Sequence, residues 1–298
     1  MKPTFREHRI PTSGSKPYIC VEGSDGCVWF CESGAAKIGC FDPATGGFRE
    51  FALPTPDAMP IGIVLGADGA LWFAEKAVNQ IGRITTDGTI TEFPLPTPKS
   101  GPDAMALGPD GAIWFSETDA GQIGRIDADG TVTEFRDGIT PGCKPLSIAV
   151  RDGALWFSEA AASQVGRITL SGAVTEFRIP SVDSQPRAMT THPDGSIWFV
   201  ETNTNALGRI DAEGAMQEFP VTTPKSSLRG VTVGPNQELW FTANFANKIG
   251  HMSREGVMLG EYDIPTAESG ARCIMAHSNG RLYFTQYDSG SIGEVIPA

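Results

Sequence analysis

A tryptophan that recurs about every 42 residues is the feature that most constrains how this chain can fold. The spacings between successive tryptophans are 43, 42, 42, 42 and 42 residues, and each tryptophan is followed by phenylalanine. The six positions are Trp29, Trp72, Trp114, Trp156, Trp198 and Trp240. Tyr283 follows 43 residues later and is also followed by phenylalanine. A period of about 40 to 45 residues is typical of propeller blades, so the chain is predicted to be a seven-bladed β-propeller.

Each repeat unit contains the signals of four short strands. An Asp-Gly pair such as Asp68-Gly69, a strong hairpin signal, precedes the strand that carries the Trp-Phe pair. A third strand contains Ile81-Gly82-Arg83, where the glycine is expected to permit a close backbone approach or a bulge. Residues 90–93 alternate apolar and polar side chains and form the fourth strand, and a proline-rich loop then leads to the next unit. The fold class is therefore all-β with four-stranded blades.

The two ends of the chain are expected to share one blade. The last unit stops after its third strand, at residues 291–295. Residues 5–12 match residues 48–55, which hold a fourth strand and its exit loop. The N-terminal strand is therefore predicted to complete the seventh blade, which removes an open sheet edge and makes residues 1–298 a single domain.

Composition narrows the partners and the compartment. The formal net charge is -12, and an acidic surface repels nucleic acid. The N-terminus has no apolar leader, and no apolar run approaches the roughly 18 residues of a membrane span. We therefore expect a cytoplasmic monomer with no nucleic-acid or membrane partner.

Four of the six cysteines lie in the first unit, at Cys20, Cys27, Cys31 and Cys40. They lack the Cys-x-x-Cys spacing of common metal sites. Buried small hydrophobic residues are the favoured interpretation, with a metal cluster as the alternative.

The sequence also predicts where a site would lie. The Asp-Gly turns share one face of the disc, and the more variable crossing loops share the other, which is the usual place for function. The start of each innermost strand should point into the central mouth on that variable face. Counted unit by unit, these residues are Tyr18, Ile61, Asp103, Leu146, Arg187, Arg229 and Arg272.

Three arginines on consecutive units are the most informative of these residues. Arg187, Arg229 and Arg272 in one narrow mouth indicate a carboxylate, a phosphate or another planar acceptor as the ligand. The alternative is that each arginine pairs with a glutamate of the neighbouring blade. No histidine maps to the mouth, so a general base there would be Asp103, Tyr18 or Tyr287.

A glutamate also recurs just after the Trp-Phe pair in five units. The positions are Glu32, Glu75, Glu117, Glu159 and Glu201, with Ala243 and Gln286 in the last two units. Such repetition favours a structural role, in which the glutamate caps backbone amides or pairs with arginine.

The repeat resembles that of the virginiamycin B lyase (streptogramin B lyase) family over essentially the whole chain. The segments that carry the resemblance are Phe73-Ala74-Glu75, Asn247-Lys248-Ile249-Gly250 and residues 91–98, Thr-Glu-Phe-Pro-Leu-Pro-Thr-Pro. The resemblance implies a seven-bladed propeller. It also implies linearisation of a cyclic depsipeptide antibiotic, and hence antibiotic resistance, through elimination at its ester with Mg²⁺ and a catalytic histidine near the mouth.

The family's functional residues carry over poorly. The position of the catalytic base is Arg272, and the position of a substrate-contacting histidine is Arg229. One metal-binding glutamate matches Gly270 without a gap, or Glu268 if the loop carries an insertion, and the other falls near residues 286–288. The resemblance therefore implies a lyase scaffold with a diverged site, with Glu268 as the candidate Mg²⁺ ligand.

Three hypotheses follow from the sequence. The first is a lyase or hydrolase that opens a cyclic ester or a related small molecule bearing an anionic group. The second is a non-catalytic propeller that binds an acidic small molecule or peptide in its arginine-lined mouth. The third is a scaffold for protein partners, for which the sequence offers no positive sign.

Overall fold

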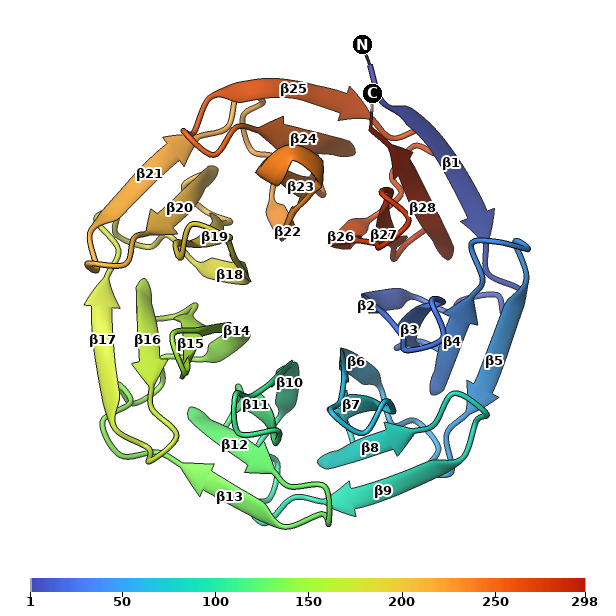
Figure 1. The fold of residues 1–298 in the computed structure, drawn as a ribbon, viewed down its shortest axis with the longest axis vertical. Helices are drawn as coiled ribbons and strands as arrows, with labels where there is room; N and C mark the ends of the chain where they lie inside the picture. The colour runs from blue at the N-terminus through green and yellow to red at the C-terminus, as the bar shows by residue number, and fades with distance from the viewer. Residues whose placement is uncertain (1, 298) are drawn as a thin grey trace.

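The computed structural model describes residues 2–297 and consists of seven four-stranded antiparallel sheets arranged as a ring (Figure 1). The predicted seven-bladed β-propeller is confirmed. One short 3-10 turn, η1 (Pro235–Gln237), interrupts blade 6. No helix among the described residues is long and apolar enough to cross a membrane.

The first four blades follow the order of the chain. Blade 1 contains β2 (Pro17–Glu22), β3 (Val28–Glu32), β4 (Lys37–Phe41) and β5 (Phe48–Ala52). Blade 2 contains β6 (Pro60–Leu65), β7 (Leu71–Glu75), β8 (Gln80–Ile84) and β9 (Ile90–Pro94). Blade 3 contains β10 (Pro102–Leu107), β11 (Ile113–Glu117), β12 (Gln122–Ile126) and β13 (Val132–Phe135). Blade 4 contains β14 (Pro145–Arg151), β15 (Ala154–Glu159), β16 (Gln164–Ile168) and β17 (Val174–Arg178).

The remaining three blades complete the ring. Blade 5 contains β18 (Pro186–Thr191), β19 (Ile197–Glu201), β20 (Ala206–Ile210) and β21 (Met216–Pro220). Blade 6 contains β22 (Leu228–Val233), β23 (Leu239–Ala243), β24 (Lys248–Met252) and β25 (Met258–Asp263). Blade 7 contains β26 (Ala271–Ala276), β27 (Leu282–Gln286), β28 (Ser291–Ile296) and, from the other end of the chain, β1 (Thr4–Arg9).

Blade 7 closes the ring as the sequence predicts. Strand β1 pairs with β28 in an antiparallel register that runs from Thr4 opposite Ile296 to Arg9 opposite Ser291. The two chain ends lie side by side at the rim of the disc (Figure 1). The outer edge of β28 is therefore paired rather than open to another chain.

The Trp-Phe pair packs both faces of each blade. In blade 2 the Trp72 ring stacks on Phe93 of the outermost strand, with ring centroids 5.6 Å apart. The neighbouring Phe73 points to the opposite face and covers Gly82, where an added Cβ would lie 2.1 Å from the phenylalanine ring. The glycine of the third strand is thus required by the close approach of an aromatic side chain, rather than by the backbone approach or bulge that the sequence predicts.

A repeated hydrogen-bonded contact fastens each blade to the next. In the loop that leaves blade 1, the backbone N–H and the hydroxyl of Thr55 donate to Glu92 of blade 2 at 3.1 and 2.7 Å. The last contact of the ring joins Thr266 to Glu7 of β1 at 3.2 and 2.9 Å. The closing strand therefore supplies both sheet pairing and the final contact between blades. The glutamates that accept these bonds around the ring are Glu50, Glu92, Glu134, Glu176, Glu218, Glu261 and Glu7.

Candidate functional site

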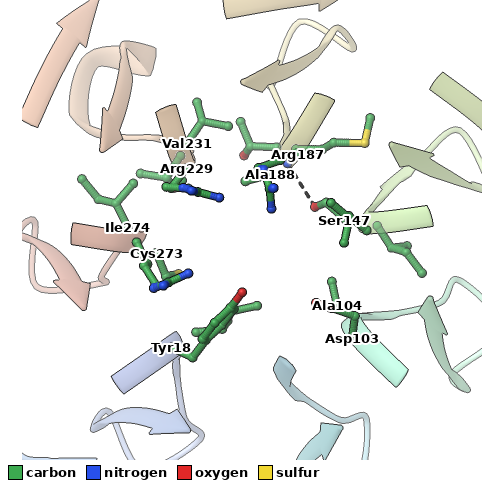
Figure 2. Close-up of a pocket in the computed structure, with 18 of the residues that line it drawn as sticks. Tyr18, Asp103, Ala104, Ser147, Arg187, Ala188, Arg229, Val231, Cys273 and Ile274 are labelled. Carbon is green, nitrogen blue, oxygen red and sulfur yellow. Dashed lines mark hydrogen bonds between the residues drawn. The ribbon is translucent and has the colours of Figure 1, made fainter. Parts of the chain in front are cut away.

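A cavity of about 320 Å³ opens at the centre of the ring (Figure 2). The residues that begin the innermost strands line it, including Tyr18, Asp103, Leu146, Arg187, Arg229 and Arg272. Ile61, which the sequence also assigns to the mouth, is only 1% exposed, and Ile63 lines the cavity from blade 2 instead. The sequence-predicted residues are thus brought together from six of the seven blades.

A bulge at the start of each inner strand turns these side chains towards the axis. In blade 6 the pairing of β22 with β23 shifts between Leu228 and Val231, which leaves Arg229 and Gly230 outside the ladder. The freed N–H of Gly230 donates to the Thr242 hydroxyl at 2.8 Å. Because the bulge is satisfied by a hydroxyl, Arg229 can face the cavity without leaving a backbone donor unpaired.

The same hydroxyl also positions the next arginine. Thr242 donates to the backbone carbonyl of Arg272 in blade 7 at 2.6 Å, and Thr285 donates to the carbonyl of Tyr18 in blade 1 at 2.7 Å. The hydroxyl that follows the Trp-Phe pair thus links the mouth residues of neighbouring blades. Sequence reasoning missed this role, although a Ser or Thr after the pair in blades 3, 4, 6 and 7 is a visible signal.

The three mouth arginines have no carboxylate partner. No salt bridge within residues 2–297 involves Arg187, Arg229 or Arg272, and the Nε atom of each is buried without a hydrogen-bond partner. The alternative in which neighbouring glutamates neutralise them is therefore wrong for this structure. The guanidinium groups instead face a shared cavity.

Burial and repulsion from neighbouring arginines lower the pKa of two of these arginines, Arg187 and Arg229. Burial, with Arg187 and Arg272 nearby, lowers the pKa of Arg229 to about 10. Burial also lowers the pKa of Arg187, against the opposing effects of Tyr18 and Asp103. At neutral pH all three groups remain cationic, so the mouth concentrates positive charge in a protein of formal net charge -12.

Two tyrosines hold Arg272. Its guanidinium lies 3.9 Å from the ring centroid of Tyr287 and 4.9 Å from that of Tyr18. The two rings meet edge-on, with centroids 6.0 Å apart. Tyr18 lines the cavity, whereas Tyr287 lies outside its lining and supports the arginine through cation–π contact.

Asp103 lies across the mouth from the arginines (Figure 2) and already has a cation. Lys76 Nζ donates to its carboxylate at 2.7 Å. Burial raises the pKa of Asp103, while Lys76 acts in the opposite direction. Asp103 and Tyr18 are thus the two sequence-predicted bases that line the cavity, and no histidine lines it in the described chain.

The repeated glutamates are structural, but their partner differs from both predicted ones. Glu75 is fully buried, Gln80 donates to its carboxyl group at 3.5 Å, and Glu92 of the outermost strand in the same blade lies close to it. Burial, followed by repulsion from Glu92, raises the pKa of Glu75 to about 8. In blade 7, Gln286 takes this place and donates to Glu7 at 2.7 Å. Glu75 in blade 2 and Gln286 in blade 7 thus both face a glutamate of the outermost strand of their blade.

The four cysteines of the first blade do not form one cluster. Within the described chain only Cys27 and Cys40 gather with a third potential ligand, the carboxylate of Asp25. Arg49 donates to Asp25 at 3.0 Å and to the Cys40 sulfur at 3.2 Å, so a cation already occupies this group. Cys273, by contrast, lines the mouth.

The residues present do not fit the Mg²⁺ site that the family resemblance implies. Glu268 is exposed and is not among the residues that line the mouth cavity in the part of the chain that the structure describes. Gly270 offers no carboxylate, Gln286 is committed to Glu7 and Ser289, and Asp288 beside Gly270 is the one carboxylate among residues 286–288. The guanidinium of Arg272 adds a positive charge to the mouth, and this charge opposes the binding of a divalent cation there.

Comparison with known proteins decides the family. The sequence model of the virginiamycin B lyase family matches residues 1–149 and 137–298. The chain belongs to the virginiamycin B lyase family. No curated protein sequence matches the chain significantly.

Solved structures agree with membership of the virginiamycin B lyase family. A streptogramin B lyase is 34% identical, with a TM-score of 0.94 over 99% of this chain and 98% of that one. Virginiamycin B lyase from Staphylococcus aureus is 36% identical, with a TM-score of 0.95 over all of both chains. A catalytically inactive histidine-to-alanine variant of that enzyme, solved with quinupristin, is 35% identical over the same extent, with a TM-score of 0.95.

Proposed function

We propose that this member of the virginiamycin B lyase family is a lyase or hydrolase with a diverged site, which opens a cyclic ester or a related small molecule bearing an anionic group. The observation that carries the proposal is the convergence of Arg187, Arg229 and Arg272 on one cavity without a carboxylate partner. Partly buried guanidinium groups whose Nε atoms lack partners are unfavourable in the free protein, and a carboxylate ligand would relieve that.

The arrangement supports elimination next to a carboxylate. A base removes the proton from the carbon that bears the carboxylate, a double bond forms, and the carbon–oxygen bond at the next carbon breaks. The arginines would stabilise the charge that develops on the carboxylate oxygens. Asp103 is the preferred base, because burial raises the pKa of its carboxyl group, and Tyr18 is the second choice.

A binding role without turnover is the second candidate function. Its support is that Lys76 already neutralises Asp103 and that no histidine lines the mouth within residues 2–297. One relative is inactive once a histidine is replaced by alanine. A rigid ring with an arginine-lined mouth would then capture an acidic small molecule or peptide.

A panel of lactones and acyclic esters, with and without a carboxylate, separates these functions. Binding is followed by calorimetry and turnover by mass spectrometry. An elimination product of a ring has unchanged mass, whereas hydrolysis adds one water. Saturable binding of the carboxylate-bearing compounds with product formation supports the enzyme, and binding without product supports the second candidate. If carboxylates bind no better than their neutral counterparts, both candidates fail.

Streptogramin B should remain intact when incubated with this protein. Both histidine positions of the family hold arginine, and a guanidinium that stays protonated cannot accept a proton. Mass spectrometry with added Mg²⁺ or chelator, beside an active lyase as control, measures ring opening. A Mg²⁺-dependent linear product of unchanged mass would overturn the diverged site and direct attention to Glu268.

A further inference from the structure

The Asp-Gly turn of blade 4 differs from the turns of the blades before it. In blade 2, Asp68 accepts a hydrogen bond from the Trp72 indole N–H at 3.4 Å. Gly66 makes room for this contact, since a Cβ there would lie 2.6 Å from the aspartate and 2.7 Å from the indole. Blade 4 has Val150 at the position of this glycine, two residues before Asp152. The valine side chain does not fit a turn with the blade 2 geometry, in which a Cβ at this position would meet the aspartate and the indole.

Blade 4 instead forms a tight two-residue hairpin. Strand β14 continues to Arg151, which pairs with Ala154 of β15, and Asp152 and Gly153 both have left-handed φ values, of 49° and 71°. The side chain of Asp152 is consequently 77% exposed. The Nε1 atom of Trp156 is buried without a hydrogen-bond partner. An indole donor has thus lost the acceptor that it has in blade 2.

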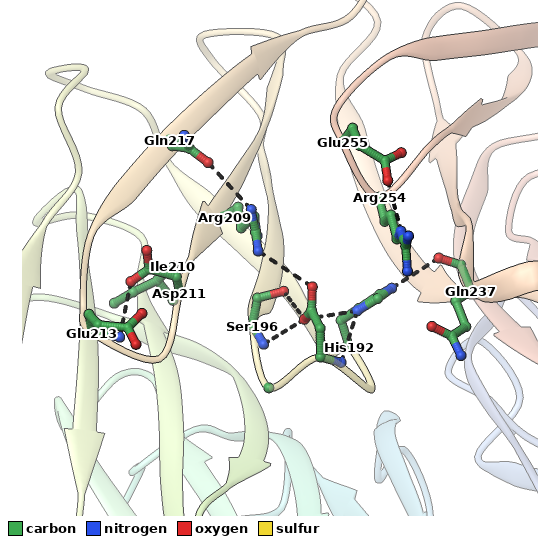
Figure 3. Close-up of polar contacts among 12 residues, drawn as sticks. His192, Ser196, Arg209, Ile210, Asp211, Glu213, Gln217, Gln237, Arg254 and Glu255 are labelled. Carbon is green, nitrogen blue, oxygen red and sulfur yellow. Dashed lines mark hydrogen bonds and ion pairs between the residues drawn. The ribbon is translucent and has the colours of Figure 1, made fainter.

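The third-strand arginine of blade 4 has lost the same acceptor. In blade 2, Arg83 pairs with the turn aspartate Asp68 at 2.7 Å. In blade 5, Arg209 reaches its own turn aspartate, Asp194, at 3.4 Å (Figure 3). The equivalent residue of blade 4 is Arg167, which makes no ion pair or side-chain hydrogen bond within residues 2–297.

A second arginine of blade 4, Arg151, also has an unpaired donor. Arg151 is 5% exposed, and its guanidinium lies 3.8 Å from the centroid of the Trp156 ring. Its Nη1 donates to the backbone carbonyls of Ile210 and Asp211 in blade 5 at 3.3 and 2.9 Å. Its Nε has no hydrogen-bond partner, because the exposed carboxylate of Asp152 is 3.7 Å away. The guanidinium is therefore held rigidly with one donor unused.

The residues that carry these unused donors, Arg151, Trp156 and Arg167, line one cavity of about 370 Å³. We propose that this cavity binds the carboxylate of a small molecule through Arg167, the Trp156 indole N–H and the Nε of Arg151. The site is distinct from the mouth, because Arg151 ends strand β14 whereas Leu146, at the other end of that strand, lines the mouth. The proposal goes beyond the proposed function and does not depend on it.

The charges at the rim favour a monoanion. Asp152 and Glu213 also line the cavity, and both are exposed. Their negative charge opposes a dianion such as phosphate more strongly than a carboxylate. The planar guanidinium of Arg167 matches the two oxygens of a carboxylate. A compact carboxylate is therefore the best match to the donors and charges of this cavity.

Acetate is the probe for this site, and the indole N–H of Trp156 is the reporter. Its nuclear magnetic resonance signal, assigned from its loss in Trp156→Phe, is followed during titration with acetate against chloride at constant ionic strength. We expect a saturable shift with acetate and a weaker effect of phosphate. Arg167→Gln should weaken acetate binding by about tenfold, because it removes a charged pair of donors.

The matched control is Arg83→Gln in blade 2, where the arginine is already paired with Asp68. It should leave the acetate affinity unchanged. Arg167→Lys keeps the positive charge but lacks the planar guanidinium group. Its acetate affinity should lie between those of the wild-type protein and Arg167→Gln. The other indole signals report whether each variant is folded. A shift that does not saturate, or one that is identical in Arg167→Gln, would overturn the proposal.

Discussion

Raising the pH from about 5 to about 9 should lower the free energy of unfolding of this protein by several kcal/mol. The cause is the set of buried glutamates that follow the Trp-Phe pairs. Burial is the largest cause that raises their pKa values, to about 8 in four blades and to about 7 for Glu117. The folded state therefore keeps these protons over a range in which the unfolded chain has released them.

The sign of the effect follows from that difference. Between the ordinary pKa of a glutamate and the raised value, the folded state binds more protons than the unfolded state, so stability falls as pH rises. The contribution is complete below the ordinary pKa and is lost as pH rises through about 7 to 8. If each of the five sites had only one unit of effective shift, the sum would be about 7 kcal/mol.

Paired substitutions test whether the glutamates are responsible. Glu75→Gln mimics the protonated form and should raise the unfolding temperature near pH 8 while leaving it almost unchanged near pH 5. Gln286→Glu creates an additional acidic pair with Glu7 and should lower the unfolding temperature near pH 8. Thermal unfolding monitored by circular dichroism at each pH measures both. A stability that stays flat across this range, or a Glu75→Gln protein that loses stability near pH 8, contradicts this account.

The fold could be predicted from the sequence because its signals repeat. The Trp-Phe spacing, the Asp-Gly turns and the third-strand glycine each reflect a contact within one blade, such as Phe73 on Gly82. The closure of the ring by strand β1 could also be predicted, because residues 5–12 match a fourth strand and its exit loop in sequence. Local propensity, periodicity and strand closure thus all indicate one architecture.

The site could be predicted only in part, because its chemistry depends on contacts between side chains of different strands. The register of the repeat placed Arg187, Arg229 and Arg272 at the mouth, but only the structure shows that no carboxylate reaches them. The partner of Glu75 was missed because Glu92 lies two strands away, and like charges are not expected to pair. A protonated carboxyl group resolves that conflict, and its pKa depends on burial that the sequence does not display.

Replacing Arg229 with methionine should stabilise the protein and weaken anion binding at the mouth. Burial and the neighbouring arginines lower the pKa of Arg229 to about 10, so holding its charge at neutral pH opposes folding. The shift corresponds to about 3 kcal/mol, or about 2 kcal/mol once solvent screening of a half-buried side chain is allowed for. Methionine fills similar space without the charge, so urea unfolding should show a gain of that order.

A ligand-binding arginine and a structural arginine are distinguished by the effect of their removal on stability. Removing the first should raise the free energy of unfolding, and removing the second should lower it. Arg83→Met is the control, because it leaves Asp68 without its partner and should reduce stability. Arg229→Met should weaken binding of carboxylate ligands by roughly a hundredfold, since one of the three half-buried cations of the mouth is removed. If Arg229→Met loses stability as Arg83→Met does, the arginine supports the fold. If the Arg229→Met protein is more stable and binds the ligand more weakly, the charge of Arg229 is unfavourable for folding and serves ligand binding.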